Sequence, residues 1–189
     1  MNELIEFVLQ FGNLNKQQID LIRSKASVIE LRKDEYYWEA GKIVKQIGFL
    51  TSGIIRVFYY NNKGEEITRY FIDENHLILS GSSIDEVYTP SEYLSAITEC
   101  KLVVFNIKDW KEISSTIVGW DDIVQKIITK HHQEKITRRS ELIAQDGTER
   151  YLDFIQKFPG LVNLVPLSYI ASYLGLTLSS LSRIRKNIR

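Results

Sequence analysis

The chain has 189 residues, enough for one large domain or two small ones with separate cores, and we favour two. Lysine plus arginine equals aspartate plus glutamate at 24 each, which excludes a globally basic nucleic-acid-binding protein and allows only a local basic surface. Apolar residues make up 44%, a globular composition, and no run approaches the roughly eighteen apolar residues of a membrane span. We therefore expect no membrane partner.

Cysteine and histidine usage argues against a cofactor. Cys100 is the only cysteine, so an internal disulfide and an iron–sulfur sensor are both excluded. His131 and His132 are adjacent, so on a helix their side chains point in different directions and cannot bind one metal ion together. With His76, they are weak candidates for the axial ligands of a haem. The first residues also lack the basic and apolar regions of a secretory signal. We expect a cytoplasmic protein with no cofactor.

Two short helices and a β-rich region are predicted first along the chain. Residues 1–25 carry two groups of apolar positions, and Asn15 is placed to cap the second group. Short β-branched and aromatic runs follow, separated by turn residues, at 28–31, 36–38, 47–50, 54–60, 67–72 and 102–107. Residues 61–64 predict a hairpin in which Gly64 supplies the positive φ. The pattern indicates an antiparallel β-sandwich or small barrel.

A long helix is predicted from Trp120 to Ile143. Its apolar stripe starts with Trp120, Ile123, Val124 and Ile127, and about 25 residues would span roughly 37 Å. Such a stripe fits either the seam of a two-fold homodimer through residues 120–143 or packing against the β domain. The sequence alone does not decide between these two arrangements.

Further short elements are predicted between this helix and residue 166. Residues 146–147 end the long helix, and Thr148 is expected to cap a helix that runs to Phe158. Residues 161–165 have the composition of a short β segment. Pro166 is expected at the first position of the next helix, where its missing amide proton costs nothing.

Two amphipathic helices meet at Gly175 within residues 167–186. A glycine can adopt the positive φ of a sharp turn, and the small Ala171 permits close helix approach. The apolar seam would comprise Ile170, Leu174, Leu176, Leu181 and Ile184. No acidic residue occurs from 159 to 189, so the second helix is purely cationic. This pattern favours a helix-turn-helix that reads DNA over a plain helical hairpin that bears solvated arginines.

The order of these parts resembles the Crp/Fnr superfamily of bacterial transcription regulators. The residues that carry the resemblance are 39–41, 47–58, 64–66, 95–99, Ala171, Gly175, Leu181, Arg183 and Ile184. The resemblance implies an α+β fold with an antiparallel jelly-roll barrel like a cyclic-nucleotide-binding domain over 1–110. It also implies a long connecting and dimerisation helix over 111–146 and a winged-helix-type helix-turn-helix domain over 147–189.

The resemblance further implies a non-enzymatic regulator that binds a near-palindromic operator in double-stranded DNA as a homodimer. With Thr177 as the helix cap, residues 178–180 form the first turn of the recognition helix, and Arg183 matches the arginine that the family retains. Arg183 is the expected guanine reader and Leu178 the expected contact for a thymine methyl. The full set of expected DNA contacts is Ser168, Tyr169, Thr177, Leu178, Ser179, Ser180, Ser182, Arg183, Arg185, Lys186 and Arg189.

The family's cyclic-nucleotide cassette is not retained. Pro90 and Ser91 occupy the place of its Arg-Ser pair, and residues 80–82 occupy the region of its Gly-Glu pair. Without the guanidinium, a bound cyclic phosphate loses a bidentate contact, so we expect no response to cyclic AMP. Two interpretations of Ser80, Gly81, Ser82, Ser83 and Ser91 stay open: they form a plain solvated loop, which we favour, or they bind a different small anion or nucleotide. Two further hypotheses are a ligand-free regulator, whose barrel is only a scaffold or docks RNA polymerase, and, remotely, a cupin-like enzyme.

Overall fold

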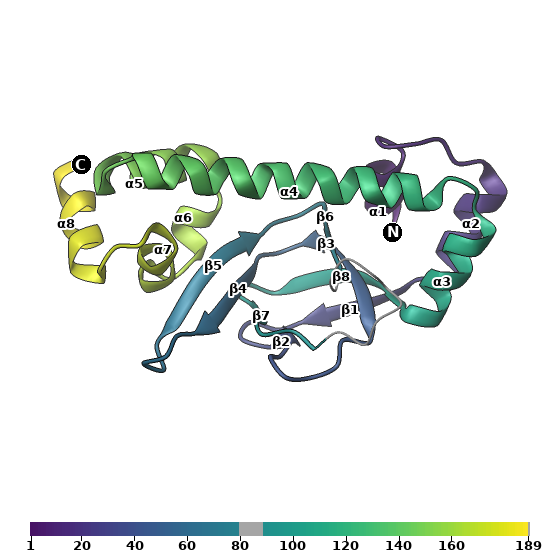
Figure 1. Ribbon diagram of the computed structural model, residues 1–189, viewed down its shortest axis with the longest axis horizontal. Coiled ribbons are helices and arrows are strands. Elements are labelled where there is room, and N and C mark those ends of the chain that lie inside the picture. Colours follow the sequence, from purple (N-terminus) through teal and green to yellow (C-terminus); the bar gives the residue numbers. More distant parts are fainter. Residues whose placement is uncertain (80–88, 189) are drawn as a thin grey trace.

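The structure, a computed structural model, describes residues 1–79 and 89–188. A β-barrel occupies the middle of an elongated molecule, with small helices at one end and the C-terminal helices at the other (Figure 1). The long helix α4 (Trp120–Ala144) runs beside the barrel and connects the two ends. The predicted α+β organisation is confirmed.

The barrel is an eight-stranded jelly roll in its strand order. Its two four-stranded sheets have the orders β1-β8-β3-β6 and β2-β7-β4-β5, with antiparallel pairing throughout. The strands are β1 (Ser27–Leu31), β2 (Tyr36–Trp38), β3 (Gln46–Ser52), β4 (Ile55–Tyr60), β5 (Glu66–Ile72), β6 (His76–Ile78), β7 (Tyr93–Ala96) and β8 (Cys100–Asn106). Strands β6 and β7 were not among the predicted runs, because their sequences, His-Leu-Ile and Tyr-Leu-Ser-Ala, contain no run of β-branched or aromatic residues.

The hairpin between β4 and β5 forms as predicted. Gly64 has a φ of 76°, and the Asn61 side chain accepts hydrogen bonds from the backbone N–H groups of Lys63 and Glu65 at 2.9 and 3.0 Å. Further along the paired strands β4 and β5, Val57 lies opposite Tyr70, whereas the next residue, Phe58, lies opposite Thr68. Arg69 therefore has no residue opposite it and is an extra residue in β5. This β-bulge changes which side of the sheet the following side chains face.

Helices α1 (Asn2–Val8), α2 (Lys16–Lys25) and α3 (Ile107–Thr116) surround the start of α4. Asn15 caps α2 as predicted, through reciprocal hydrogen bonds with Gln18 of 2.9 and 2.8 Å. Gly119, with a φ of 84°, separates α3 from α4. The segment 111–146 therefore contains the end of α3, a turn and α4, and is not one continuous helix.

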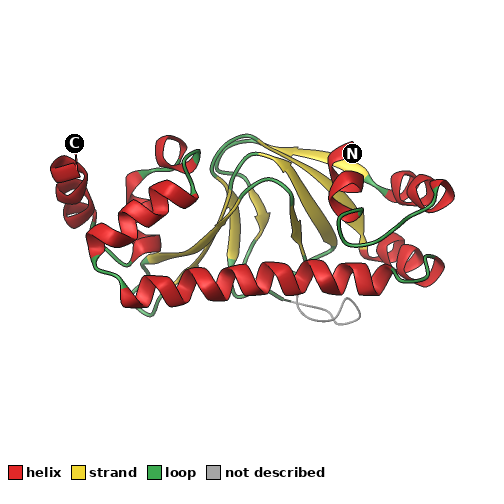
Figure 2. Cartoon of the chain, turned by 90° about the horizontal axis from the view of Figure 1, so that it is seen from above, coloured by secondary structure: helices red, strands yellow, loops and turns green. Residues whose placement is uncertain are grey.

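The apolar stripe of α4 packs within the chain. Trp120, Ile123, Val124 and Ile127 are buried in a cluster with α1, α3 and the outer face of the sheet that contains β3 and β8. Figure 2 shows α4 lying along that side of the sheets. For this half of α4, the structure answers the open question in favour of intramolecular packing.

The C-terminal region is helical, with α5 (Gly147–Lys157), α6 (Leu161–Leu164), α7 (Leu167–Leu174) and α8 (Leu178–Ile188). Three local predictions are corrected here. Asp146 caps α5 in place of Thr148, because Asp146 and Glu149 form a complete capping box. The expected β segment is α6, and Pro166 precedes α7 as its N-cap with an extended ψ of 136°. Between residues 146 and 188 the described chain contains no strand, so no wing is formed within this stretch.

The C-terminal helices share a core with the barrel. Phe154, Ile170, Ala171, Leu174 and Leu181 are buried together with barrel residues, namely Ile54, Phe71 and Ile97. The helix-turn-helix is therefore docked on the barrel at the end of β5. None of the described helices combines the length and apolarity needed to cross a membrane.

Candidate nucleic-acid interface

The turn between α7 and α8 has the geometry of a helix-turn-helix. Gly175 has a φ of 67°, as predicted. The backbone N–H of Gly175 donates to the Ser172 carbonyl at 3.2 Å, and that of Leu176 to the Ala171 carbonyl at 2.9 Å. This pair of bonds is a Schellman motif, which satisfies the last carbonyls of α7 and reverses the chain.

Hydroxyl groups cap the start of α8. The Ser180 backbone N–H donates to the Thr177 hydroxyl oxygen at 3.1 Å, so Thr177 is the predicted cap. The Thr177 hydroxyl in turn donates to the Ser180 hydroxyl at 2.8 Å, and the Ser179 hydroxyl lies 3.0 Å away. Thr177 and Ser179 are exposed at this end of the helix.

One side of α8 is buried and the other faces outward. Leu181 is fully buried against α7, and Ile184 is partly buried beside it. The outward residues comprise Leu178, Ser179, Ser182, Arg183 and Lys186, whereas Arg185 is half-buried. Among the described residues, Arg183 and Lys186 form no ion pair with a carboxylate. Figures 1 and 2 place α8 at one extreme of the molecule, which leaves this cationic side accessible.

Tyr169, predicted as a DNA contact, has another partner. Its ring lies 3.7 Å from the guanidinium carbon of Arg56 in β4, and its side chain is half-buried. Ser168, the other predicted contact on α7, is exposed. Arg189 lies outside the described residues. The structure thus places the Tyr169 ring against the barrel, whereas Ser168 is exposed on α7.

Arg56 is a buried residue at the contact between the barrel and α7, and the sequence patterns did not identify it. It is only 2% exposed, and its Nε donates to the Thr68 hydroxyl at 2.8 Å while its Nη1 lies 2.5 Å from Glu66 Oε2. The neighbouring backbone N–H of Thr68 donates to the Ser172 hydroxyl of α7 at 2.9 Å. These contacts fix α7 against β4 and β5. The signal in the sequence was a charged residue, Arg56, among the β-branched and aromatic residues of a predicted strand. This signal does not indicate that Tyr169 is its partner on α7.

A cavity of about 480 Å³ lies between the barrel and α4. Its wall includes Trp38, Tyr70, Pro90, Glu92, Gln125 and Ile128. Ser91 lies between two of these wall residues but is itself exposed. The expected effector residues Ser80, Gly81, Ser82 and Ser83 lie outside the described residues.

Cys100 faces the barrel interior. Burial raises the pKa of its thiol, because the thiolate would lose solvation there. The described residues include no group of three histidine, cysteine, aspartate or glutamate side chains arranged to hold a metal ion.

Solved structures of regulators match the whole arrangement of barrel, long helix and C-terminal helices. FixK2 from Bradyrhizobium japonicum aligns with a TM-score of 0.73 at 15% identity, covering 86% of this chain and 84% of its own. A protein described as a transcriptional regulator of the Crp/Fnr family, from Eubacterium rectale, aligns with a TM-score of 0.73 at 16% identity, covering 92% and 83%. The chain has the Crp/Fnr fold.

The same fold is found in the c-di-GMP-responsive global regulator CLP of Xanthomonas campestris, with a TM-score of 0.72 at 13% identity, covering 92% of this chain and 91% of that one. The Crp/Fnr fold accounts for the jelly roll, α4 and the helix-turn-helix in one chain. No protein-family model and no curated protein matches the sequence.

Proposed function

We propose that this chain is a DNA-binding transcriptional regulator, not an enzyme, and that it inserts α8 into the DNA major groove. The observation that carries the proposal is the outward side of α8, which presents hydroxyls and exposed cations while Leu181 anchors the opposite side to α7. Such a helix combines base-edge contacts with phosphate contacts. The likeness of the whole chain to regulators of the Crp/Fnr fold supports the same interpretation.

The roles of the side chains follow their positions on α8. Arg183 is the proposed bidentate reader of a guanine, and Ser179 and Ser180 contact bases directly or through water. Leu178, half exposed at 50%, is suited to a thymine methyl. Lys186 and Arg185 bind phosphates, and Ser168 does so from the start of α7.

A homodimer through α4 is the proposed active form. The apolar stripe in the first half of α4 is buried against the rest of the chain, so the contact between two copies would involve the exposed side of the helix. Ile136 on that helix is 66% exposed, so it offers an apolar side chain to such a contact. A two-fold dimer places its recognition helices about 34–36 Å apart, one turn of DNA.

Selection of bound duplexes from a random pool, followed by sequencing, tests the proposal. We expect enrichment of an inverted repeat whose half-sites are separated by about 10 base pairs, centre to centre. An enriched half-site without a repeat would remove the dimer and keep the DNA-binding role. No enrichment over unselected DNA at low salt would remove the DNA-binding role.

The second candidate function is a regulator that senses a small anion or nucleotide. The cavity of about 480 Å³ beside α4 favours it, since ligand sites span about 300–1,000 Å³. Thermal unfolding in the presence of single nucleotides and inorganic anions separates the two candidates, because a ligand that binds the folded state raises the melting temperature. A ligand-free regulator would show no specific shift.

A further inference from the structure

The Ser179 hydroxyl is exposed in the first turn of α8, on the side of the helix that also presents Arg183. The two residues are four positions apart, so their side chains are neighbours on the helix surface. A serine hydroxyl has one hydrogen to donate and two lone pairs that accept, and it can therefore bind any base edge. The hydrogen bonds that Ser179 makes within the chain determine which of these capacities remains.

The single hydrogen of the neighbouring Thr177 hydroxyl is already used. It is donated to Ser180 Oγ at 2.8 Å, while the Thr177 oxygen accepts the Ser180 backbone N–H at 3.1 Å. Ser179 Oγ lies 3.0 Å from the same Thr177 oxygen. Because Thr177 has no second hydrogen, Ser179 is the donor in this contact.

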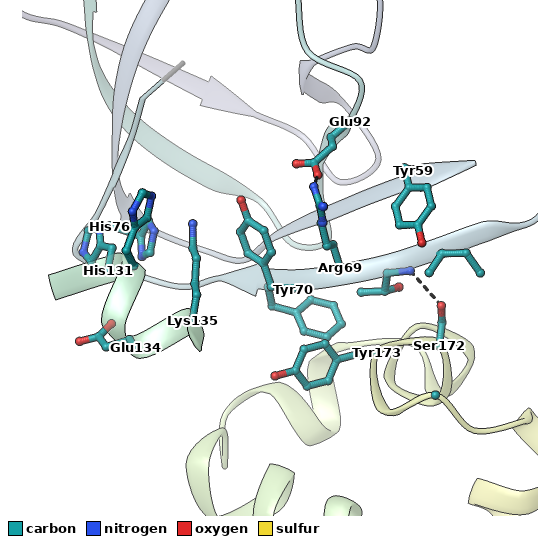
Figure 3. Close-up of a pocket in the computed structure, with 15 residues that line it drawn as sticks. Tyr59, Arg69, Tyr70, His76, Glu92, His131, Glu134, Lys135, Ser172 and Tyr173 are labelled. Carbon is teal, nitrogen blue, oxygen red and sulfur yellow. Dashed lines mark hydrogen bonds and ion pairs between the residues drawn. The ribbon is translucent and has the colours of Figure 1, made fainter. Parts of the chain in front are cut away.

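The turn that carries Thr177 is fixed on the barrel. The Thr68 backbone N–H of β5 donates to Ser172 Oγ of α7 at 2.9 Å (Figure 3). The Schellman bonds at Gly175 then lead directly to Thr177. The oxygen that accepts the Ser179 hydrogen is therefore in place before DNA binds, which lowers the cost of ordering it in the complex.

With its hydrogen directed at Thr177, Ser179 can accept a hydrogen bond from DNA but cannot donate one. In the major groove the donors are amino groups, N6 of adenine and N4 of cytosine. Guanine O6 and thymine O4 are acceptors, so either of them would meet only lone pairs of the Ser179 oxygen. The hydroxyl of Ser179 is thus selective although serine as a residue type is not.

We propose that Ser179 recognises an amino base, adenine or cytosine, on the strand that it contacts, and that Thr177 is the positioning residue that sets this preference. The inference rests on the proposed insertion of α8 into the major groove. One helical turn separates Ser179 from Arg183, a rise of about 5.4 Å, and base pairs are about 3.4 Å apart. The amino base therefore lies about one or two base pairs from the guanine that Arg183 reads.

Sequencing of duplexes selected from a random pool by the parent chain and by Ser179→Ala locates the contacted base pair. We expect one position per half-site at which the variant loses the preference of the parent. There the parent should select the two base pairs that carry their amino base on the same strand, A·T and C·G, about tenfold over T·A and G·C. Any other grouping, or no changed position, would overturn the inference. No enrichment by the parent would remove the proposed DNA-binding function itself, and the inference with it.

Base analogues at that position show which partner donates. Purine in place of adenine, or pyrimidin-2-one in place of cytosine, removes the amino group and leaves the chain unchanged. We expect the parent to bind the analogue duplex about tenfold more weakly, and Ser179→Ala to bind it no more than about twofold more weakly. Equal weakening of the two chains would overturn the inference, because the amino group would then have no contact with Ser179.

Variants of Thr177 test its positioning role. Thr177→Val frees the Ser179 hydrogen, so the tenfold preference should fall below about threefold, whereas Thr177→Ser keeps the hydroxyl and the preference. Loss of the helix cap in Thr177→Val lowers affinity for every duplex, but the ratio between duplexes is compared within one variant. Asn187→Ala, at an exposed position near the end of α8, should leave the ratio unchanged. An unchanged ratio in Thr177→Val, or its loss in Thr177→Ser, would contradict the role of Thr177.

Discussion

The guanidinium carbon of Arg56 lies 3.7 Å from the centre of the Tyr169 ring, and this contact joins the barrel to the first helix of the helix-turn-helix. Phe58 lies on the same guanidinium at 4.3 Å, and Glu66 offsets its charge. Of these partners only Tyr169 lies on α7, so another placement of α7 would remove the ring that covers the guanidinium from the C-terminal side while Phe58 and Glu66 of the barrel remain.

Removing this cation should destabilise the chain. We expect Arg56→Ala to lower the free energy of unfolding by about 2 kcal/mol, because a buried side chain is removed and the buried Thr68 hydroxyl loses its partner, whereas the exposed Glu66 carboxylate can be solvated. Urea unfolding followed by circular dichroism measures the change. Arg32→Ala, at an exposed position, is the matched control and should stay within about 0.5 kcal/mol of the parent. Similar losses in both variants would contradict the assigned role of Arg56.

The turn of the helix-turn-helix should depend on its glycine. Gly175→Ala forces a side chain into a φ of 67° and should cost about 1–2 kcal/mol of unfolding free energy. Gly160→Ala provides the control, because Gly160 has a φ of −70° and open space around it. There we expect no loss, or a gain of about 0.4–1 kcal/mol. Thermal unfolding of both variants distinguishes the two outcomes, and equal stability would contradict the turn geometry.

Sequence patterns predicted the elements whose signals are local. Gly175, Ala171 and Thr177 define a turn and a cap within a few residues, and each has the predicted conformation or environment. The long helix and the β4–β5 hairpin were also predicted, because their apolar periodicity and turn residues lie within short stretches of the sequence. Strands β6 and β7 contain too few β-branched and aromatic residues to be recognised from the sequence. Strand β6 pairs with β3, and strand β7 pairs with β2 and β4.

Contacts between distant segments could not be predicted. The contact of Arg56 with Tyr169 joins residues from different parts of the chain, and no spacing rule relates them. The same holds for Arg150, whose guanidinium donates to the carbonyls of Gln145 and Leu174 at 3.0 Å each and fixes the end of α7. Tyr169 was predicted as a DNA contact on the first helix, and no sequence pattern indicated its contact with Arg56.

Cys100 should react slowly in the folded chain. Because burial raises the pKa of its thiol, less thiolate is present at any pH below that raised pKa than in an exposed cysteine. We expect alkylation by iodoacetamide at pH 8 to be at least tenfold slower in the native chain than in urea. Stability should also fall as the pH rises above about 8.5, where the thiol of the unfolded chain ionises first. Equal alkylation rates in the native and unfolded chain would show that the thiol is accessible.

Lys186 should contribute affinity without sequence preference. If it binds a phosphate, Lys186→Ala weakens binding to a selected operator and to a random duplex by the same factor. The slope of log affinity against log salt concentration should fall in magnitude by about 1. Fluorescence anisotropy over a salt series measures both, and an unchanged slope would contradict a phosphate contact.

The most direct test of base recognition by α8 is the variant Arg183→Ala. Its affinity for a selected operator and for a random duplex is compared with that of the parent chain. We predict a loss of about 1–3 kcal/mol on the operator, roughly 5- to 150-fold, because a bidentate guanine contact is removed. On the random duplex the loss should be less than threefold. Equal losses on the two duplexes, or no preference of the parent chain for the operator, would contradict the account.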